Sequence, residues 1–118
     1  MPLTNEKSID AGRLLERCMG NSDLAKRLMN VFMNTLPVEK SAIQGAINSS
    51  DMAAIARTAH KLKGTASNMC ADGLAEFANA VEQAARADQA DLVSQHWFDL
   101  SSQIDMVMES LFSKDSDQ

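Results

Sequence analysis

The 118-residue sequence has little of what builds folds other than helical ones. It contains five glycines, two prolines and only 4% aromatic residues, whereas alanine and methionine are abundant and β-branched residues are few. Because alanine and methionine favour helices, and β-branched and aromatic residues favour strands, the composition predicts an all-α protein. A chain of this length fits one domain with a core of its own.

Several functional classes are excluded by what is missing. Cys18 and Cys70 form no C-x-x-C pair and stand at no zinc-type spacing from the two histidines, so we expect neither a metal site nor a disulfide framework. The net charge of −5 argues against nucleic-acid binding, which would need a basic face, and no block of lysines and arginines suggests an anionic membrane surface. Since no signal peptide or membrane-length apolar run is visible, we expect a cytoplasmic protein without membrane insertion.

Signatures of nucleotide and metal chemistry are also missing. The chain has no phosphate-binding glycine loop and no kinase signature, so we expect no ATP site, no kinase activity and no cofactor of its own. A ferritin-like bundle would need inward Glu-x-x-His pairs on two helices, and these are absent, which disfavours a metal-binding bundle.

Apolar periodicity predicts five helical segments. They cover about 9–19, 22 or 23 to 47, 51–69, 72–87, and a last segment that Asp88 caps and that runs past Leu111. The second has Leu28 and Val31 in its apolar stripe, and Pro37 either kinks it or opens the first turn of a continuation. Because the loops are short, we expect an up-and-down antiparallel four-helix bundle with a short additional N-terminal helix. We expect a single domain over residues 1–118, with a core at about 9–113 and frayed ends at 1–7 and 114–118.

The third segment carries two residues that its own folding does not explain. Its apolar stripe alternates spacings of three and four through Met52, Ile55, Ala59, Leu62, Ala66 and Met69. At about 100° per residue, His60 lies about 130° from the centre of this stripe and Gly64 about 170°, so both should be exposed. A glycine inside a helix costs about 1 kcal/mol relative to alanine. Since the stripe continues past Gly64, the glycine is not needed as a terminator, and its remaining uses are close approach by another molecule or unobstructed access to a neighbouring side chain.

An exposed histidine on a helix is most often an ordinary surface residue. A neutral imidazole, however, has a free ring nitrogen that can attack phosphorus. Lys63, three residues after His60, would offer positive charge to phosphoryl oxygens. His96, beside the stripe residue Trp97, has no such companions, and we take it as structural or incidental.

The stretch "AHKLKGTASN" resembles the motif of histidine-containing phosphotransfer (HPt) domains, in which a His-x-Leu-Lys-Gly run is followed by small residues. The resemblance extends over nearly the whole chain, because the predicted helices follow in family order. It implies that His60 accepts a phosphoryl group at Nε2 from a receiver aspartyl-phosphate and passes it reversibly to another receiver. It also implies that Lys63 assists electrostatically and that Gly64 lets the receiver approach.

The family places a polar side chain of the next helix against the other ring nitrogen, and the matching residue is Glu82. A carboxylate there would fix the tautomer and leave Nε2 free, whereas the alternative is an ordinary solvated glutamate. The sequence departs from the family at Cys70, where many members have glycine ten residues after the histidine. The shape of that loop is therefore left open, and Cys70 itself is expected to be a small buried residue.

The resemblance also implies partners. We expect response-regulator receiver domains and an upstream hybrid histidine kinase to bind a monomer, with Mg²⁺ on the receiver rather than on this chain. Candidate docking residues on the outward side of the histidine helix are Arg57, Lys61, Ser67 and Asn68. The alternative is a helical adaptor that binds receivers or other signalling proteins without carrying phosphate. The presence of both His60 and Lys63 favours the carrier.

Overall fold

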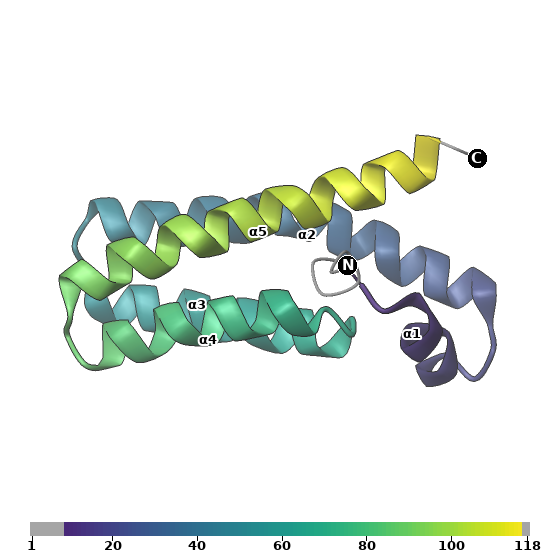
Figure 1. Cartoon of the computed structure of the whole chain (residues 1–118), viewed down its shortest axis with the longest axis horizontal. Helices are drawn as coiled ribbons and strands as arrows, with labels where there is room; N and C mark the ends of the chain where they lie inside the picture. The colour runs from purple at the N-terminus through teal and green to yellow at the C-terminus, as the bar shows by residue number, and fades with distance from the viewer. Residues whose placement is uncertain (1–8, 117–118) are drawn as a thin grey trace, which may run out of the picture.

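The structure, a computed structural model, describes residues 9–116, with the side chains of residues 9–111. Its helices are α1 (Ala11–Arg17), α2 (Ser22–Asn48), α3 (Met52–Asn68), α4 (Asp72–Arg86) and α5 (Ala90–Ser116). The predicted all-α architecture is confirmed: α2 to α5 run up and down as a bundle, and the short α1 lies at one end (Figure 1). Helix α5 continues past residue 113, where the predicted core ends, and the predicted frayed segment 1–7 lies outside the described residues.

Three helices begin at side-chain caps that the sequence supplies. Asp10, Asn21 and Asp51 each accept a hydrogen bond from the backbone N–H three residues later, at 3.1, 3.0 and 3.1 Å. The cap of α2 is thus Asn21, just before the neighbourhood of Ser22 and Asp23 in which the sequence predicts the start of the helix. Each cap satisfies a donor that the first helical turn leaves free, which typically stabilises a helix by about 1 kcal/mol.

All four turns between helices place a residue other than glycine in the left-handed region. These residues are Met19 (φ 56°), Ser50 (φ 54°), Cys70 (φ 59°) and Asp88 (φ 58°). In each turn the next N–H bonds to a carbonyl five residues earlier, as Ala71 does to Ala66 at 2.9 Å, which is the Schellman arrangement. Cys70 therefore adopts the conformation that glycine adopts most easily, and it is buried as predicted.

The predicted cap of the last helix was wrong. Asp88 belongs to the turn that ends α4, because its left-handed backbone lets the N–H of Gln89 bond to the carbonyl of Ala84 at 3.0 Å. The first helical bond of α5 runs from the N–H of Val93 to the carbonyl of Gln89, also at 3.0 Å. Helix α5 therefore begins at Ala90, two residues after Asp88.

Helix α2 is continuous through Pro37 over its 27 residues, so Pro37 does not start a separate helix. Proline removes one backbone donor and crowds the preceding turn, which bends a helix. In Figure 1 the first half of α2 slopes towards α1, whereas its second half runs alongside α3. Pro37 is exposed, so its ring lies on the solvent side of α2.

The helices differ in length, and α1 occupies the end of the bundle where the shorter α3 and α4 stop. At about 1.5 Å per residue, α2 and α5 span about 40 Å, whereas α3 and α4 span about 25 Å or less. Helix α1 lies beside the protruding part of α2, at the end of the α3–α4 hairpin (Figure 1). Arg13 pairs with Asp72, Arg17 Nη1 donates to the carbonyl of Asn68 at 3.3 Å, and the N–H of Asp10 donates to the carbonyl of Cys70 at 3.0 Å. The hairpin end is thereby fixed in place.

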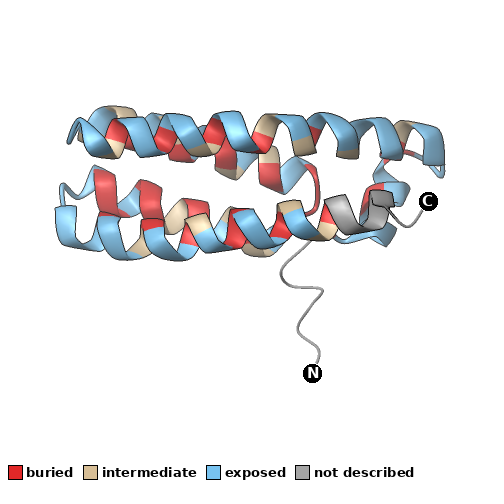
Figure 2. Cartoon of the chain, turned by 90° about the horizontal axis from the view of Figure 1, so that it is seen from above, coloured by how far each residue is buried: buried red, intermediate tan, exposed pale blue. Residues whose placement is uncertain are grey.

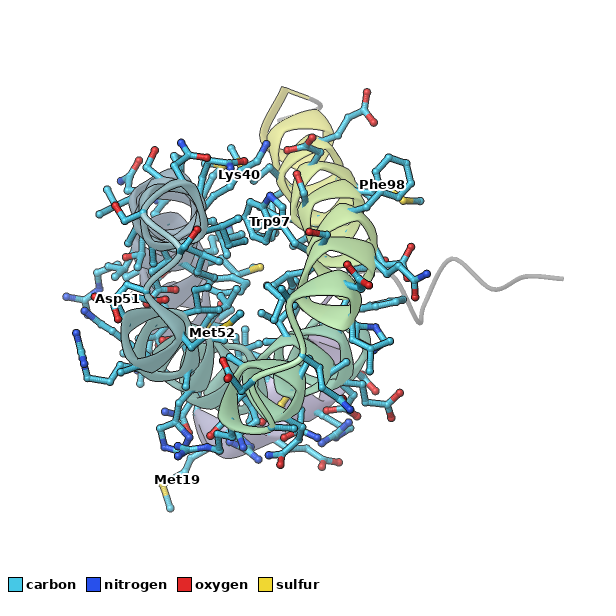
Figure 3. The ribbon with its side chains drawn as sticks, turned by 90° about the vertical axis from the view of Figure 1, so that its left-hand side faces the viewer. Met19, Lys40, Asp51, Met52, Trp97 and Phe98 are labelled. Carbon is cyan, nitrogen blue, oxygen red and sulfur yellow. The ribbon has the colours of Figure 1, made fainter. Side chains whose placement is uncertain are left out.

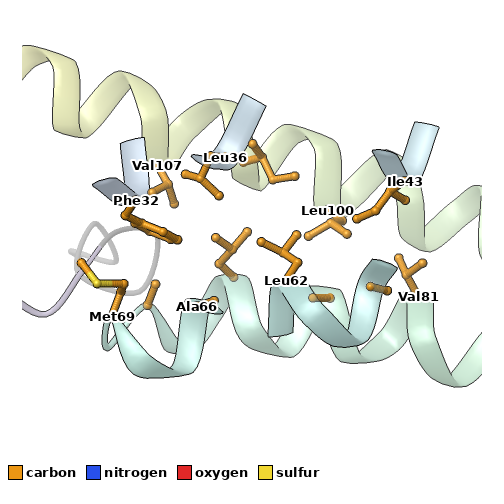
Figure 4. Close-up of a cluster of buried hydrophobic side chains, with 14 of the residues drawn as sticks. Phe32, Leu36, Ile43, Leu62, Ala66, Met69, Val81, Leu100 and Val107 are labelled. Atoms are coloured by element: carbon orange, nitrogen blue, oxygen red, sulfur yellow. The ribbon is translucent and has the colours of Figure 1, made fainter. Parts of the chain in front are cut away.

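The core is a continuous apolar seam between the four long helices. Figure 4 shows side chains of α2 (Phe32, Leu36, Ile43), α3 (Leu62, Ala66), its C-terminal cap (Met69), α4 (Val81) and α5 (Leu100, Val107) converging on it. Buried residues accordingly face inward on each helix (Figure 2). In the view along the bundle, Trp97 lies between α5 and α2, and Met19 and Phe98 point outward (Figure 3). Trp97 Nε1 donates to Gln44 Oε1 at 2.9 Å, which joins α5 to α2.

Two predicted stripe residues of α2 lie outside this core. Leu28 is 37% exposed and Val31 60% exposed, which corrects their assignment to the buried face. The buried face of this part of α2 carries Ala25 and Phe32 instead, and Val31, about 100° round the helix from Phe32, turns away from the core. In α5 the spacing of four and three predicts a stripe, and its residues are all buried: Val93, Trp97, Leu100, Ile104, Val107 and Leu111.

The interface between α3 and α4 is built largely from alanine. Buried alanines stand at positions 56, 59 and 66 of α3 and at 78, 84 and 85 of α4. Helices can approach more closely where the side chains between them are small. Polar side chains at the edge of this interface can therefore reach from one helix to the other, and they form the candidate site.

Candidate functional site

His60 stands on the outer side of α3, and its side chain is 61% exposed. The prediction that it faces solvent agrees with this placement. The imidazole is held on one side only: Nδ1 lies 3.0 Å from Glu82 Oε2, across the interface on α4. The other ring nitrogen, Nε2, makes no hydrogen bond to the described residues.

Glu82 is the buried centre of the site, with its side chain only 3% exposed. Lys63 Nζ lies 2.8 Å from Oε1, and the Arg86 guanidinium reaches Oε2 through Nε at 2.9 Å and Nη2 at 2.8 Å. Burial by itself would raise the pKa of this carboxyl, but hydrogen bonds from Lys63, Arg86 and His60 outweigh burial and lower the pKa to about 2. Glu82 is therefore ionised at neutral pH, and the alternative of a solvated surface glutamate is excluded.

An ionised Glu82 decides which nitrogen of His60 carries the proton. A carboxylate can only accept hydrogen bonds, so the imidazole nitrogen facing it must donate. In a neutral ring the proton is then on Nδ1, and the lone pair on Nε2 is directed away from Glu82. The geometry therefore presents an oriented nucleophilic nitrogen at the surface.

Lys63 lies closer to the interior than a typical surface lysine, with its side chain 30% exposed. Besides the ion pair with Glu82, its Nζ donates to Asn79 Oδ1 at 3.2 Å. Asn79 Oδ1 also accepts from Gln83 Nε2 at 3.3 Å. The lysine is thus held on the same carboxylate as His60 and carries its charge beside the ring.

Gly64 is exposed on α3, one turn after His60. A Cβ built there would meet no atom within 4 Å apart from its own chain neighbours and helix backbone, so packing within the described chain does not require glycine. The absence of a side chain leaves the surface beside His60 open. Its use for an approaching molecule stays a prediction.

The predicted docking residues Arg57, Lys61, Ser67 and Asn68 are all exposed on α3. Arg57 also lines a shallow hollow of about 410 Å³ between the start of α3 and the end of α4. Ala56 and Ala85 lie in this hollow, and Arg86 lies on its edge next to Glu82. The structure therefore continues the surface around His60 into a hollow that has two arginines.

The described part of the chain offers no metal site and no membrane span. No three His, Cys, Asp or Glu side chains are grouped to hold an ion within residues 9–111. None of the described helices is long and apolar enough to cross a membrane. His96 is half-buried on α5, a helix whose backbone does not pack against that of α3.

Comparison with known proteins places this site in a family. The family model of the Hpt domain matches residues 27–113, which include the whole site. The chain belongs to the Hpt family. Hpt domains transfer phosphoryl groups in the phosphorelays of histidine kinases, and they act as carriers rather than as kinases. The phosphotransfer class predicted from the motif around His60 is therefore confirmed.

A solved Hpt structure has the same fold. The Hpt domain of a sensor hybrid histidine kinase from Shewanella superposes with a TM-score of 0.80 at 19% identity, covering 97% of this chain and 98% of that one. No curated protein matches the sequence.

Two residues of the Hpt site were missed by the sequence analysis. Arg86 follows Glu82 by four residues, and Asn79 precedes it by three, so both lie on the same side of α4. Charged residues at this spacing pair on helices, which was a readable signal for Arg86. The sequence alone does not show which glutamates face another helix, so the spacing of Glu82 and Arg86 did not assign Arg86 to the site.

Proposed function

We propose that His60 is the phosphoacceptor and that it exchanges phosphoryl groups with the aspartates of receiver domains. The observation that carries this proposal is the 3.0 Å contact between Nδ1 and the buried Glu82 carboxylate. That contact leaves Nε2 as the free nucleophile on a side chain that is 61% exposed. Function in a phosphorelay requires such a nitrogen at the surface, where a partner's phosphorus can reach it.

The proposed step is a direct displacement at phosphorus. The Nε2 lone pair forms a bond to phosphorus while the bond to the aspartyl oxygen breaks, and its electrons return to the receiver carboxylate. The imidazole keeps its Nδ1 proton and becomes positively charged, and Glu82 stabilises that charge at 3.0 Å. The reverse displacement passes the group to a second receiver.

Two further residues support the step in this proposal. Lys63 supplies positive charge to the phosphoryl oxygens, and the open surface at Gly64 admits the receiver. Mg²⁺ is supplied by the receiver, since phosphoryl transfer needs charge neutralisation beyond one lysine. We propose that the chain acts in the cytoplasm as a monomer between an upstream hybrid kinase and its receivers.

Docking is proposed to centre on α3, with Arg57, Lys61, Ser67 and Asn68 at the rim. Helix α3 carries three basic residues and no acidic one, although the whole chain has a net charge of −5. The active sites of receivers are acidic because they bind Mg²⁺. A basic docking helix on an acidic protein would orient the encounter.

The test is phosphoryl transfer from a phosphorylated receiver, followed by mapping of acid-labile, alkali-stable phosphate. We expect label on His60 in the wild type, none in His60→Gln, and an unchanged rate in the matched variant His96→Gln. The helical fold should stay intact in His60→Gln, because the side chain is exposed and Lys63 and Arg86 still pair with Glu82. Label retained in His60→Gln would contradict the assignment. A correctly folded wild type that accepts no phosphoryl from several receivers would indicate the adaptor instead.

A further inference from the structure

The two oxygens of Glu82 serve different partners. Oε2 faces His60 Nδ1 at 3.0 Å and both Nε and Nη2 of Arg86, at 2.9 and 2.8 Å. Oε1 faces Lys63 Nζ alone among the described side chains, at 2.8 Å. Lys63 can therefore leave without disturbing the oxygen that orients the histidine.

The site also holds one cation more than the carboxylate needs. A buried carboxylate without a cation is strongly destabilising, because its charge has lost the solvation of water. With Lys63 as its sole partner, Glu82 would hold the lysine in place. With Arg86 also present, Glu82 keeps a paired charge when Lys63 moves away.

The two cations are suited to different tasks. Arg86 is four residues after Glu82 on the same helix and contacts one oxygen through two N–H groups. Such a fork is a geometrically fixed partner. Lys63 is a compact charge at the end of a flexible stem and comes from the other helix, three residues after His60. Its stem needs only to rotate for Nζ to turn from Oε1 towards a group bonded to the neighbouring imidazole.

We propose that Arg86 is a positioning residue that keeps Glu82 paired, so that Lys63 is released to the phosphoryl group on His60. This inference rests on the proposed function. Arg86 itself touches neither the phosphoryl group nor the receiver aspartate in this scheme. Its effect passes entirely through Glu82, and this gives the proposal a distinctive test.

The experiment is a double-mutant cycle between Arg86 and Glu82, read as single-turnover transfer at saturating phosphorylated receiver. Arg86→Met keeps an apolar stem and removes the charge, and we expect transfer to slow by about tenfold, a typical coupling between contacting charged residues. In the Glu82→Gln background the same change should have no further effect, because a neutral amide does not retain Lys63. Arg86→Lys should restore most of the rate, since it returns a cation to Oε2.

Receiver affinity provides the matched control. Arg57→Gln alters the other arginine of the hollow, which makes no contact with Glu82, and it should change receiver affinity but not the rate at saturation. Arg86→Met should slow transfer at saturating receiver and leave receiver affinity unchanged. This split separates a positioning role from docking and from a general loss of stability.

Three outcomes would overturn the inference. An unchanged rate in Arg86→Met would show that Lys63 does not need Arg86, and equal slowing in the wild-type and Glu82→Gln backgrounds would show that Arg86 acts directly on the partner. Failure of Arg86→Lys to restore the rate would show that charge is not what matters. If wild-type His60 takes no label, the proposed function fails and the inference fails with it, whereas the other outcomes leave the proposed function intact.

Discussion

Helix α3 is flanked by two buried glutamates that behave in opposite ways. Glu39 approaches it from α2 and Glu82 from α4. As whole residues they are 5% and 2% exposed. Burial raises the pKa of Glu39 above its ordinary range, and a hydrogen bond from Thr65 and the charge of Lys61 oppose this only in part. Burial also acts on Glu82, but Lys63, Arg86 and His60 lower its pKa to about 2.

The difference lies in the partners rather than in the burial. Glu39 receives one neutral hydrogen bond, from Thr65 Oγ1 at 3.3 Å, and its Oε1 has no partner among the described residues. Glu82 is contacted by two cations and an imidazole. A buried carboxylate stays charged only where cations and donors replace the lost water. The carboxylate on the α4 side of α3 is therefore held in its ionised form, whereas burial favours the neutral form of the carboxyl on the α2 side.

The largest expected effect concerns acid stability on the α4 side. The pKa of Glu82 is lowered from its ordinary 4.5 to about 2, so its contribution is present above pH 4.5 and is lost as the pH falls towards 2. At about 1.36 kcal/mol per unit, the contribution is at most about 3 kcal/mol, since Arg86 and His60 are partly solvated. We expect the stability difference between wild type and Glu82→Gln, measured by urea unfolding, to disappear across this range. A difference that stays constant with pH would refute the ion-pair account.

The opposite change is expected on the α2 side. Glu39→Gln removes a charge that burial penalises and keeps an acceptor for Thr65, so we expect the free energy of unfolding to rise by about 1 kcal/mol at neutral pH. Because burial raises the pKa of Glu39 in the folded state, the ionised carboxylate destabilises the wild type at pH values above the folded pKa. Below the ordinary pKa of 4.5 the group is protonated in both the folded and the unfolded state, and this destabilisation is gone. The gain should therefore shrink as the pH falls. Urea unfolding at neutral and acidic pH measures the gain in stability and its decrease. A Glu39→Gln variant that is less stable than wild type at neutral pH would contradict the contrast between Glu39 and Glu82.

The smallest expected change in stability compares a glycine on each helix. Gly64 on α3 and Gly45 on α2 are both exposed, and a Cβ at either would meet nothing within 4 Å. Glutamine at either position should raise the free energy of unfolding by about 0.5–1 kcal/mol through helix propensity. Only Gly64→Gln should also slow phosphoryl transfer, by about tenfold or more, because its side chain obstructs the receiver.

Thermal unfolding and single-turnover transfer on this pair of variants separate access from propensity. Equal transfer rates in Gly64→Gln and Gly45→Gln would show that the open surface beside His60 has no role in docking.

Much of the fold could be predicted because it depends on local chemistry. The cap at Asp51 follows from a side chain that reaches the backbone three residues on. The outward placement of His60 and Gly64 follows from the turn of the helix relative to the apolar stripe. The phosphotransfer class followed from the short motif around His60, read as a family resemblance.

Errors arose where one local pattern fitted two structures. Asp88 has the composition of a cap but closes the turn after α4, since a left-handed residue was needed there. Leu28 and Val31 fit the spacing of a buried stripe, yet Ala25 and Phe32 occupy the buried face of that part of α2. Periodicity finds an apolar stripe, but where apolar residues are crowded it does not tell which of them face the core.

By itself, the sequence determined the five helices, the bundle and the exposed histidine, because caps, periodicity and short loops act within one helix and its neighbours along the chain. Only the tertiary structure decided the electrostatics of the site. Whether Glu82 is buried, which nitrogen of His60 it faces and that Arg86 and Asn79 join the cluster depend on the rotation and spacing of α3 against α4. The physical reason is that a buried carboxylate keeps its charge only where cations meet it, and here they come from both helices.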